Sequence, residues 1–283
     1  LLVVVLLSAL VLAWFFGEIL LQPNSYLFGT GGDPLQQYFS TLYYLKYDTG
    51  WMLTGMNYPY GEHINFTGNQ PLLALLLNWW HHHVFPVAGS VIGIMNAVML
   101  LSMLVCPVFL FLILKKMYLP DWWAVIAAVA IGLLSPQIER LIGHFGLVYS
   151  FFIPMIWWIL LKILETEGKK RWLFFGLMSA SIFFMSGMHL YYFALGGIFV
   201  GAFLVFYLFR FNKWKEWKLA ALILASVVLP YLIIAVILSL TDPFDDRTTS
   251  PWGFLHYISR WEAVFLPRYG WIKEVFRVRF LDF

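Results

Sequence analysis

Side chains suited to acid–base chemistry and to phosphate binding occur in the polar stretches between long apolar runs. In chain order these candidates are Asp33, Glu62, Arg140, His144, His189, Asp245, Asp246 and Arg247. A carboxylate can act as a general base or a metal ligand, whereas arginine and histidine donate charge-assisted hydrogen bonds to phosphate. The residue types therefore indicate a site for an anionic substrate, if the fold brings these stretches together.

Asp33 stands in the segment Gly29-Thr30-Gly31-Gly32-Asp33-Pro34, directly after the first apolar run. Proline suits the first turn of a helix, so the segment predicts a helix that begins here with Asp33 as its N-cap. Two interpretations stay open at this point. Asp33 either caps the helix, or it is a carboxylate held at a membrane surface as general base or metal ligand.

His144 and His189 each lie where a polar stretch meets an apolar run. Each is either an interfacial histidine that hydrogen-bonds a carbonyl group or a ligand for a phosphate, which Arg140 nearby in sequence favours. Arg140 and Glu139 can alternatively pair with each other. The group Asp245, Asp246 and Arg247 is either a solvated turn or a set of contacts to sugar hydroxyls, a divalent ion and phosphate.

The composition identifies an integral membrane protein. The 283 residues are 61% hydrophobic and 12% charged, with a mean hydropathy of +0.78, which is far from the balance of a soluble domain. The net charge of +3 comes from short loops and gives no argument for nucleic acid. The single cysteine, Cys106, lies inside an apolar run and excludes an intrachain disulfide.

Seven apolar runs predict seven crossings in an all-α polytopic bundle. They cover residues 1–21, 87–114, 122–134, 147–164, 172–187, 190–209 and 217–240. Lysine and arginine cluster at residues 115–116, 169–171 and 210–218, and the positive-inside rule places these clusters in the cytoplasm. The candidate residues then face the extracytoplasmic side.

The chain is predicted to be a single transmembrane domain over residues 1–283. The first crossing, 1–21, lacks its start, and residues 22–86 form an extracytoplasmic loop. Six further crossings fill residues 87–240, and residues 241–283 lead outside the membrane to a missing C-terminal part. Within the first loop, residues 34–47 predict an interfacial helix with Leu35, Tyr38, Phe39 and Leu42 on its apolar face, and residues 71–84 predict a second interfacial helix.

This layout resembles the GT-C superfamily of polytopic membrane glycosyltransferases, bacterial type. The resemblance rests on the first crossing, the long outer loop opening with Asp33, and the segments Asn57-Tyr58-Pro59-Tyr60-Gly61-Glu62, Gly143-His144-Phe145 and His189-Leu190-Tyr191-Tyr192. It implies an inverting transfer of a sugar from a polyprenyl-phosphate-linked donor, with Asp33 as the catalytic base or metal ligand. Many GT-C members carry a second acidic motif in a later outer loop, and no matching acidic pair precedes Glu139 here.

The predicted function is therefore sugar transfer to a glycan, lipid or protein acceptor, on the outer face of a bacterial inner membrane. Asp33 is assigned to catalysis, and Arg140, His144, His189, Arg247, Glu62, Asp245 and Asp246 to substrate binding. A divalent cofactor, Mg²⁺ or Mn²⁺, stays open. The alternatives are a transporter or lipid flippase, which the scarcity of charge within the crossings disfavours, and a noncatalytic membrane scaffold.

Overall fold

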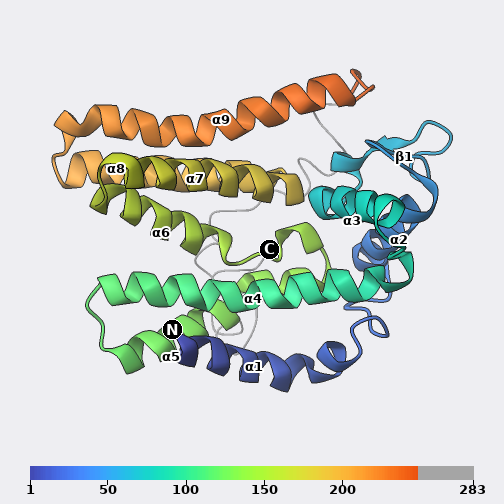
Figure 1. Ribbon diagram of the computed structural model, residues 1–283, viewed down its shortest axis with the longest axis horizontal. Helices are drawn as coiled ribbons and strands as arrows, with labels where there is room; N and C mark the ends of the chain where they lie inside the picture. The colour runs from blue at the N-terminus through green and yellow to red at the C-terminus, as the bar shows by residue number, and fades with distance from the viewer. Residues whose placement is uncertain (248–283) are drawn as a thin grey trace, which may run out of the picture. The chain divides into compact units, whose positions relative to one another are not determined.

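Long α-helices dominate the part of the chain, residues 1–247, that this computed structural model describes (Figure 1). The chain divides into two units, Leu1–Asp242 and Pro243–Phe283, and the helices and strands described here belong to the first. In chain order they are α1 (Leu2–Leu21), α2 (Gly32–Tyr47), β1 (Met52–Leu53), β2 (Glu62–His63), η1 (Ile64–Phe66), α3 (Pro71–His83), η2 (Ala88–Ser90), α4 (Val91–Lys116), α5 (Asp121–Leu133), η3 (Pro136–Ile142), η4 (Phe145–Leu147), α6 (Phe152–Glu165), α7 (Gly168–Met188), α8 (Tyr191–Arg210), η5 (Trp214–Glu216) and α9 (Trp217–Thr241), where η marks a 3₁₀ helix.

Within the described residues, seven helical segments are long and apolar enough to cross a membrane. At most 44% of the residues in any of their apolar windows are buried, so most of their apolar surface faces outward. A soluble protein rarely exposes apolar surface on this scale. The predicted all-α transmembrane bundle is confirmed, and the protein is an integral multi-pass membrane protein. The short fifth helix is extended by η3 into a segment that reaches Ile142.

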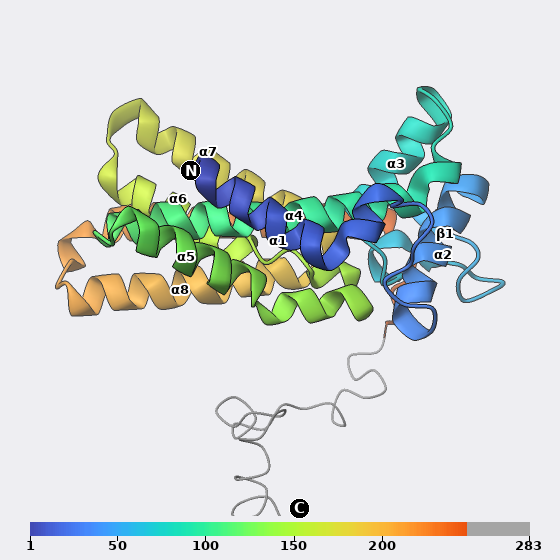
Figure 2. The ribbon, with the colours of Figure 1, turned by 90° about the horizontal axis from the view of Figure 1, so that it is seen from below.

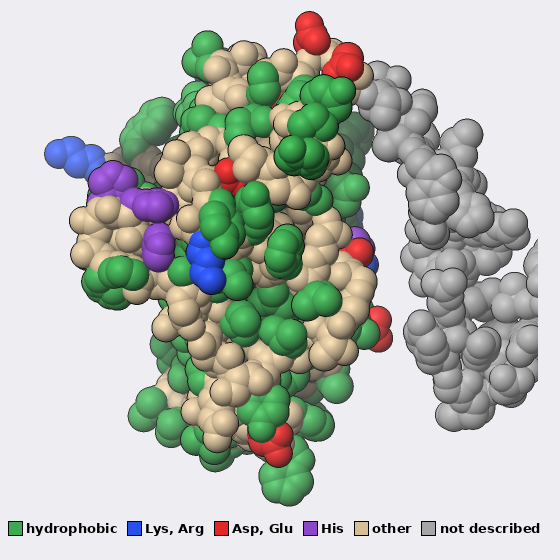
Figure 3. Space-filling model, turned by 90° about the vertical axis from the view of Figure 1, so that its right-hand side faces the viewer, with side chains coloured by type: hydrophobic (Ala, Val, Ile, Leu, Met, Phe, Trp, Pro, Cys, Tyr) green, Lys and Arg blue, Asp and Glu red, His purple; other side chains and the backbone are tan. Residues whose placement is uncertain are grey.

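The first unit has two ends of different chemistry. The basic end contains the turns at residues 115–121, 165–168 and 210–217, and the loop end contains α2, α3 and the β-strands (Figures 1 and 2). The lysine and arginine clusters of residues 115–116, 162–171 and 210–218 belong to the basic end. Of the other basic residues in this unit, Lys46 and Arg140 remain. Figure 3 views the loop end, where charged side chains are scattered among hydrophobic ones.

Helix α2 places only part of its predicted apolar face against the protein. Leu35 and Phe39, from the predicted apolar face, are exposed, whereas Gln37, Thr41 and Tyr44 are buried. Tyr38, from the same predicted face, is buried. The exposure of Leu35 and Phe39 is compatible with the predicted interfacial position, in which apolar side chains face lipid. α2 therefore presents a mixed, hydrogen-bonding face to the bundle and an apolar face outward.

Two buried asparagines hold α2 in place, one from the bundle and one from α3. Asn96 of α4 accepts a hydrogen bond from the Tyr38 hydroxyl, and its amide donates to the carbonyl oxygens of Pro23 and Tyr26, both at 2.8 Å. Asn78 of α3 donates to two carbonyl oxygens at the end of α2, each at 2.9 Å. Since buried amides are costly unless they are satisfied, these contacts fix where α2 lies.

The two strands form a hairpin that reaches the end of α9. β1 and β2 pair antiparallel, with Met52 opposite His63. The buried His63 ring stacks on Trp51, and its Nε2 lies 3.0 Å from the Thr241 hydroxyl. The first loop is thereby tied to the last described helix.

Candidate functional site

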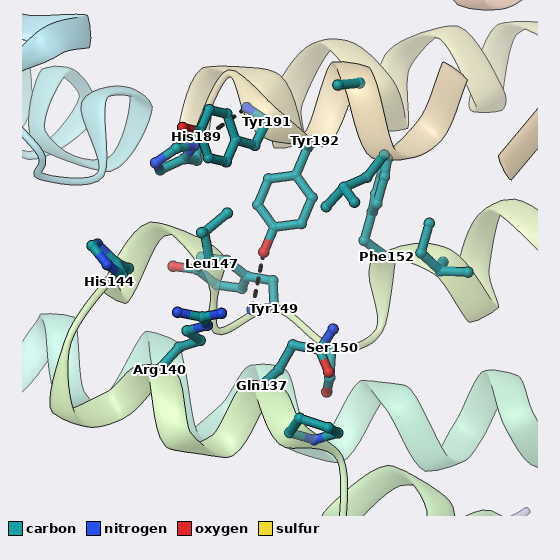
Figure 4. Close-up of a pocket in the computed structure, with 14 residues that line it drawn as sticks. Gln137, Arg140, His144, Leu147, Tyr149, Ser150, Phe152, His189, Tyr191 and Tyr192 are labelled. Atoms are coloured by element: carbon teal, nitrogen blue, oxygen red, sulfur yellow. Dashed lines mark hydrogen bonds between the residues drawn. The ribbon is translucent and has the colours of Figure 1, made fainter. Parts of the chain in front are cut away.

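A cavity of about 690 Å³ opens at the loop end, and both candidate histidines line it. Its walls come from η3, from the segment between residues 144 and 153, and from the turn between α7 and α8. Figure 4 shows Arg140 and His144 on one side of the cavity, with His189 and Tyr191 across from them. The structure thus brings His189 to the same site as Arg140 and His144, which belong to an earlier part of the sequence.

Asp33 lies close to His144, which lines this cavity. The Asp33 Oδ2 lies 3.9 Å from the His144 Nδ1, and their side chains are 57% and 55% exposed, respectively. That separation is longer than a hydrogen bond, so both groups keep free positions for a ligand. Asp33 does not itself line the cavity, whereas His144 does.

The predicted N-cap role of Asp33 is wrong. Helix α2 begins at Gly32, its N-cap is Gly31, and no side chain makes a cap hydrogen bond. Gly32 has a φ of +59°, a left-handed conformation that glycine adopts at little cost, and the helix starts two residues earlier than expected. Asp33 therefore stands in the first turn with its carboxylate free of the backbone, which removes the purely capping interpretation.

Gln37 holds the loop that carries His144. Its Nε2 donates to the Gly143 carbonyl oxygen at 2.6 Å, and its Oε1 accepts from the Phe145 N–H at 2.9 Å. These two bonds bracket His144 on both sides. Because Gln37 lies four residues after Asp33, both side chains leave the same face of α2. One helix therefore positions the carboxylate directly and the imidazole through its backbone.

His189 fits into a gap that only a glycine leaves. A Cβ atom on Gly146 would lie 2.9 Å from His189 Cδ2 and 3.0 Å from the Met188 carbonyl oxygen. Any larger residue would push the loop at residues 143–147 away from the α7–α8 turn. Gly146 therefore allows the two histidine-bearing segments to approach each other.

The His189 imidazole is neutral at neutral pH. Burial, with a smaller contribution from the nearby His144, lowers its pKa from 6.5 to about 4. Its Nδ1 accepts a hydrogen bond from the Tyr191 N–H at 3.2 Å, so the proton of the neutral ring resides on Nε2. His189 thus offers one hydrogen-bond donor and no charge. The expectation that it supplies positive charge needs this correction.

This depressed pKa predicts a pH-dependent contribution to stability. The folded state binds the His189 proton less tightly than the unfolded chain, whose imidazole has a pKa near the ordinary 6.5. The contribution is complete above pH 6.5 and is lost as the pH falls toward 4. The measurement is the Tm of the protein in detergent at about pH 7.5 and at about pH 4.5. We expect Tm to fall less between these two pH values in His189→Gln than in the wild type.

The matched control is His82→Gln, because His82 is an exposed histidine of α3. Its removal should leave the pH profile of the wild type unchanged. Identical profiles for the wild type and His189→Gln would contradict the assigned pKa of His189.

Arg140 supplies positive charge at the cavity. Pro136 begins the 3₁₀ helix η3 after Ser135, and Arg140 follows one turn later with its guanidinium at the cavity. Among the described residues it has no carboxylate within ion-pair distance, so the predicted alternative of an Arg140–Glu139 pair is wrong. An exposed, unpaired guanidinium is available for bidentate contact with a phosphate.

A tyrosine network stiffens the inner wall of the cavity. The Tyr149 N–H donates to the Tyr192 hydroxyl at 3.2 Å, as Figure 4 shows, and the Tyr149 hydroxyl donates to Gln70 Oε1 at 2.7 Å. These bonds link α8, the segment before α6 and the start of α3. The wall is therefore held by three parts of the chain.

Glu62 does not line this cavity. Glu62 accepts hydrogen bonds from the Asn57 amide at 2.9 Å and from the His63 N–H at 2.8 Å, so its carboxylate organises the hairpin. Asp245, Asp246 and Arg247 belong to the second unit. There, the Arg247 guanidinium stacks over the Phe244 ring at 5.4 Å.

Sequence reasoning missed Gln37, Tyr149 and Tyr192. The i, i+4 spacing of Asp33 and Gln37 was a usable signal, since it places a second polar side chain beside the candidate carboxylate. The tyrosines gave none, because interfacial tyrosines are common in membrane helices.

The described residues do not fit a protein-held divalent ion. No three of their histidine, cysteine, aspartate or glutamate side chains gather as a metal-binding group, and Asp33 and His144 alone would supply two ligands. An all-protein site for Mg²⁺ or Mn²⁺ needs more oxygen ligands than this pair provides.

Comparison with known proteins gives a family match. The model of a family described as Domain of unknown function (DUF6311) matches residues 5–278. No curated protein matches the chain. No solved structure matches it.

Proposed function

The chain belongs to the DUF6311 family, and from the geometry of its site we propose that it is a membrane glycosyltransferase. It transfers a sugar from a polyprenyl-phosphate-linked donor to an acceptor hydroxyl. One observation carries the proposal: the Asp33–His144 pair stands beside Arg140 and the neutral His189 at one cavity. This arrangement places a proton acceptor next to donors suited to a phosphate.

The reaction is a single displacement at the anomeric carbon. The acceptor oxygen forms a bond to that carbon while the bond from the carbon to the phosphate oxygen breaks, and its electron pair stays on the phosphate. The hydroxyl proton moves to the Asp33–His144 pair, where the Asp33 carboxylate supplies the negative charge that holds it. General base catalysis of this kind needs the base within hydrogen-bonding reach of the hydroxyl proton, directly or through one water.

Arg140 and His189 act on the leaving group. Charge builds on the phosphate as the glycosidic bond breaks, and the Arg140 guanidinium can contact two phosphate oxygens. The His189 Nε2–H adds a neutral hydrogen bond without bringing a second cation close to His144. The burial of His189 strengthens that bond, since it excludes water from the ring.

The cavity suits a substrate that is polar at one end and apolar at the other. Leu147, Phe152, Ile153 and Leu195 line it together with the polar groups. Phe152 and Ile153 begin α6 and Leu195 lies in α8, so apolar wall continues into two membrane-spanning segments. A lipid-linked sugar fits this gradient, with its tail in lipid and its head at Arg140. The acceptor is a glycan, a lipid or a protein.

The chemistry proposed here uses side chains of the chain alone. Because the described ligand set does not fit a divalent ion, no step passes through Mg²⁺ or Mn²⁺. Glu62 has no substrate role in this proposal, since its carboxylate is engaged within the hairpin.

Two observations disfavour the other function classes. Among the buried side chains that the structure describes, the acidic or basic ones are Asp48 and His63, and both lie in the first loop instead of a crossing. Ion-coupled transporters usually place ionisable groups within the membrane. The convergence of Arg140, His144 and His189 on one cavity also favours a site over a scaffold.

The proposed orientation puts the loop end outside and the basic end in the cytoplasm of a bacterial inner membrane, as the positive-inside rule favours. Tyr60 is 79% exposed at the loop end, and Lys169 is exposed at the basic end. In sealed cells, an impermeant thiol reagent should modify Tyr60→Cys and leave Lys169→Cys unmodified. The native Cys106 is buried and should not react. Labelling of Lys169→Cys alone would reverse the orientation.

The proposal is tested by reconstitution of the full chain into proteoliposomes. Polyprenyl-phosphate donors with different radiolabelled sugars are supplied one at a time, with a membrane extract as the source of acceptors. We expect one donor to yield labelled product together with free polyprenyl phosphate, and protein-free liposomes to yield neither. Movement of intact donor between leaflets without bond cleavage would instead establish a flippase, and an unchanged donor across the panel would overturn the proposal.

A further inference from the structure

A second cavity, of about 660 Å³, lies at the basic end between the first turns of α7 and α9. Its charged lining consists of Arg171, Lys213, Lys218, Glu167 and Glu216. It is remote from the loop-end site, since the two cavities occupy opposite ends of the same crossings. The glycosyl-transfer proposal gives it no role.

The carboxylates that line this cavity do not balance all of its lysine and arginine charges. Glu216 is engaged, because its carboxylate accepts from Lys213 Nζ at 2.9 Å and from the Tyr207 hydroxyl at 2.5 Å. Within residues 1–247, Arg171 and Lys218 have no carboxylate within ion-pair distance. Glu167 lines the cavity and has no ion-pair partner among these described residues. Three cations against two carboxylates leave the cavity positive.

A backbone hydrogen bond orients the Arg171 guanidinium in a way that suits anion binding. Its Nε donates to the Thr166 carbonyl oxygen at 2.6 Å, which fixes the guanidinium plane and leaves its terminal nitrogens free. Helix α7 begins at Gly168 in the same cavity, and its N-cap, Glu167, makes no side-chain cap hydrogen bond. The backbone N–H groups of a helix's first turn favour a bound anion.

The rest of the lining is apolar. Trp172, Phe175, Leu219 and Leu222 face the cavity, and they lie in the first turns of membrane-spanning helices. Positively charged residues next to an apolar wall, at the end of a crossing, suit a ligand with an anionic head and an apolar tail better than they suit a small soluble anion. Basic pockets between transmembrane helices are known binding sites for anionic lipid headgroups.

We propose that this cavity binds an anionic phospholipid. Arg171, Lys218 and the start of α7 contact the phosphate, and the glycerol backbone and first methylene groups pack on Trp172 and Leu222. The shared chemistry is a phosphate group, and the apolar lining assigns it to a lipid of the surrounding leaflet instead of soluble phosphate.

The test compares two double variants of the full chain that lose the same charge at the same end. Arg171→Gln with Lys218→Gln changes the cavity, whereas Lys169→Gln with Lys170→Gln changes exposed lysines that do not line it. In detergent, Tm is followed while phosphatidylglycerol, phosphatidylcholine or inorganic phosphate is added. Lys218→Gln alone serves if the first double variant does not fold.

We expect phosphatidylglycerol to raise the Tm of the wild type and of the Lys169/Lys170 variant at the same half-saturating concentration. The Arg171/Lys218 variant should need at least about tenfold more, because charge-assisted hydrogen bonds are lost. Phosphatidylcholine should have no comparable effect. If both double variants bound phosphatidylglycerol equally more weakly than the wild type, the binding would reflect the general positive charge of this end, and the proposed site would be wrong. An equal Tm rise with inorganic phosphate alone would overturn the lipid assignment.

Discussion

Asp33→Asn should lower the rate of sugar transfer by about 10²–10⁴-fold, the range over which a general base typically contributes. The asparagine keeps the size of the side chain but cannot hold the proton that leaves the acceptor hydroxyl. His144, 3.9 Å away, would remain as a weaker acceptor without its negative partner. The loss should therefore appear in kcat with the KM for the lipid-linked donor nearly unchanged, because Asp33 does not contact the phosphate.

The fold should tolerate this change. The Asp33 carboxylate makes no cap hydrogen bond, and the favourable interaction of a first-turn acid with the helix dipole is worth only about 0.3–1 kcal/mol. Asp121→Asn is the matched control, because Asp121 is a first-turn acid of α5 that pairs with Lys115. It should retain full transfer activity. Full activity in Asp33→Asn as well would remove Asp33 from the mechanism.

Arg140→Gln should weaken the binding of the lipid-linked sugar donor by about 10- to 150-fold. This is the loss expected when charge-assisted hydrogen bonds worth about 1.5–3 kcal/mol disappear. Arg140 provides the charge at the cavity, whereas His189 contributes a neutral donor. The effect should appear as a higher KM for the lipid-linked donor and a lower kcat, since the phosphate charge increases in the transition state. The KM for the acceptor should change little.

Two further variants separate geometry from charge. Arg140→Lys keeps the charge but cannot form the planar, two-pronged contact, so its activity should fall between those of the wild type and Arg140→Gln. Arg210→Gln removes an arginine at the basic end and should have no effect on the donor KM. A donor KM that is unchanged in Arg140→Gln would assign the phosphate to other groups.

The crossings were predictable because their signal is local. Each apolar run carries its own evidence of length and hydropathy, and the observed segments agree with the predicted ones within a few residues at most ends. Two terminal details were not predictable in the same way. The start of α2 depends on the left-handed Gly32, and the extension of α5 depends on a 3₁₀ helix after Pro136.

The contacts within the site needed the structure. Topology alone placed Arg140, His144 and His189 at one end, because each lies between crossings of the right parity. The amphipathic pattern of α2 was predictable, but its contacts with the bundle were not, because the hydrogen bond from Tyr38 to Asn96 joins positions far apart in sequence. The same reason hid Gln37, whose partners Gly143 and Phe145 lie more than a hundred residues away.

The outward face of α2 allows forces from the bilayer to act on the positions of Asp33 and His144. Leu35 and Phe39 are exposed on one side of this helix, while Asp33 and Gln37 act on the other. A change in membrane thickness or lateral pressure that tilts α2 moves the carboxylate and, through Gln37, the loop around His144. The separation between these two groups is then a property of the host lipid as well as of the protein, so the same chain would be tuned differently in a thin membrane and in a thick one.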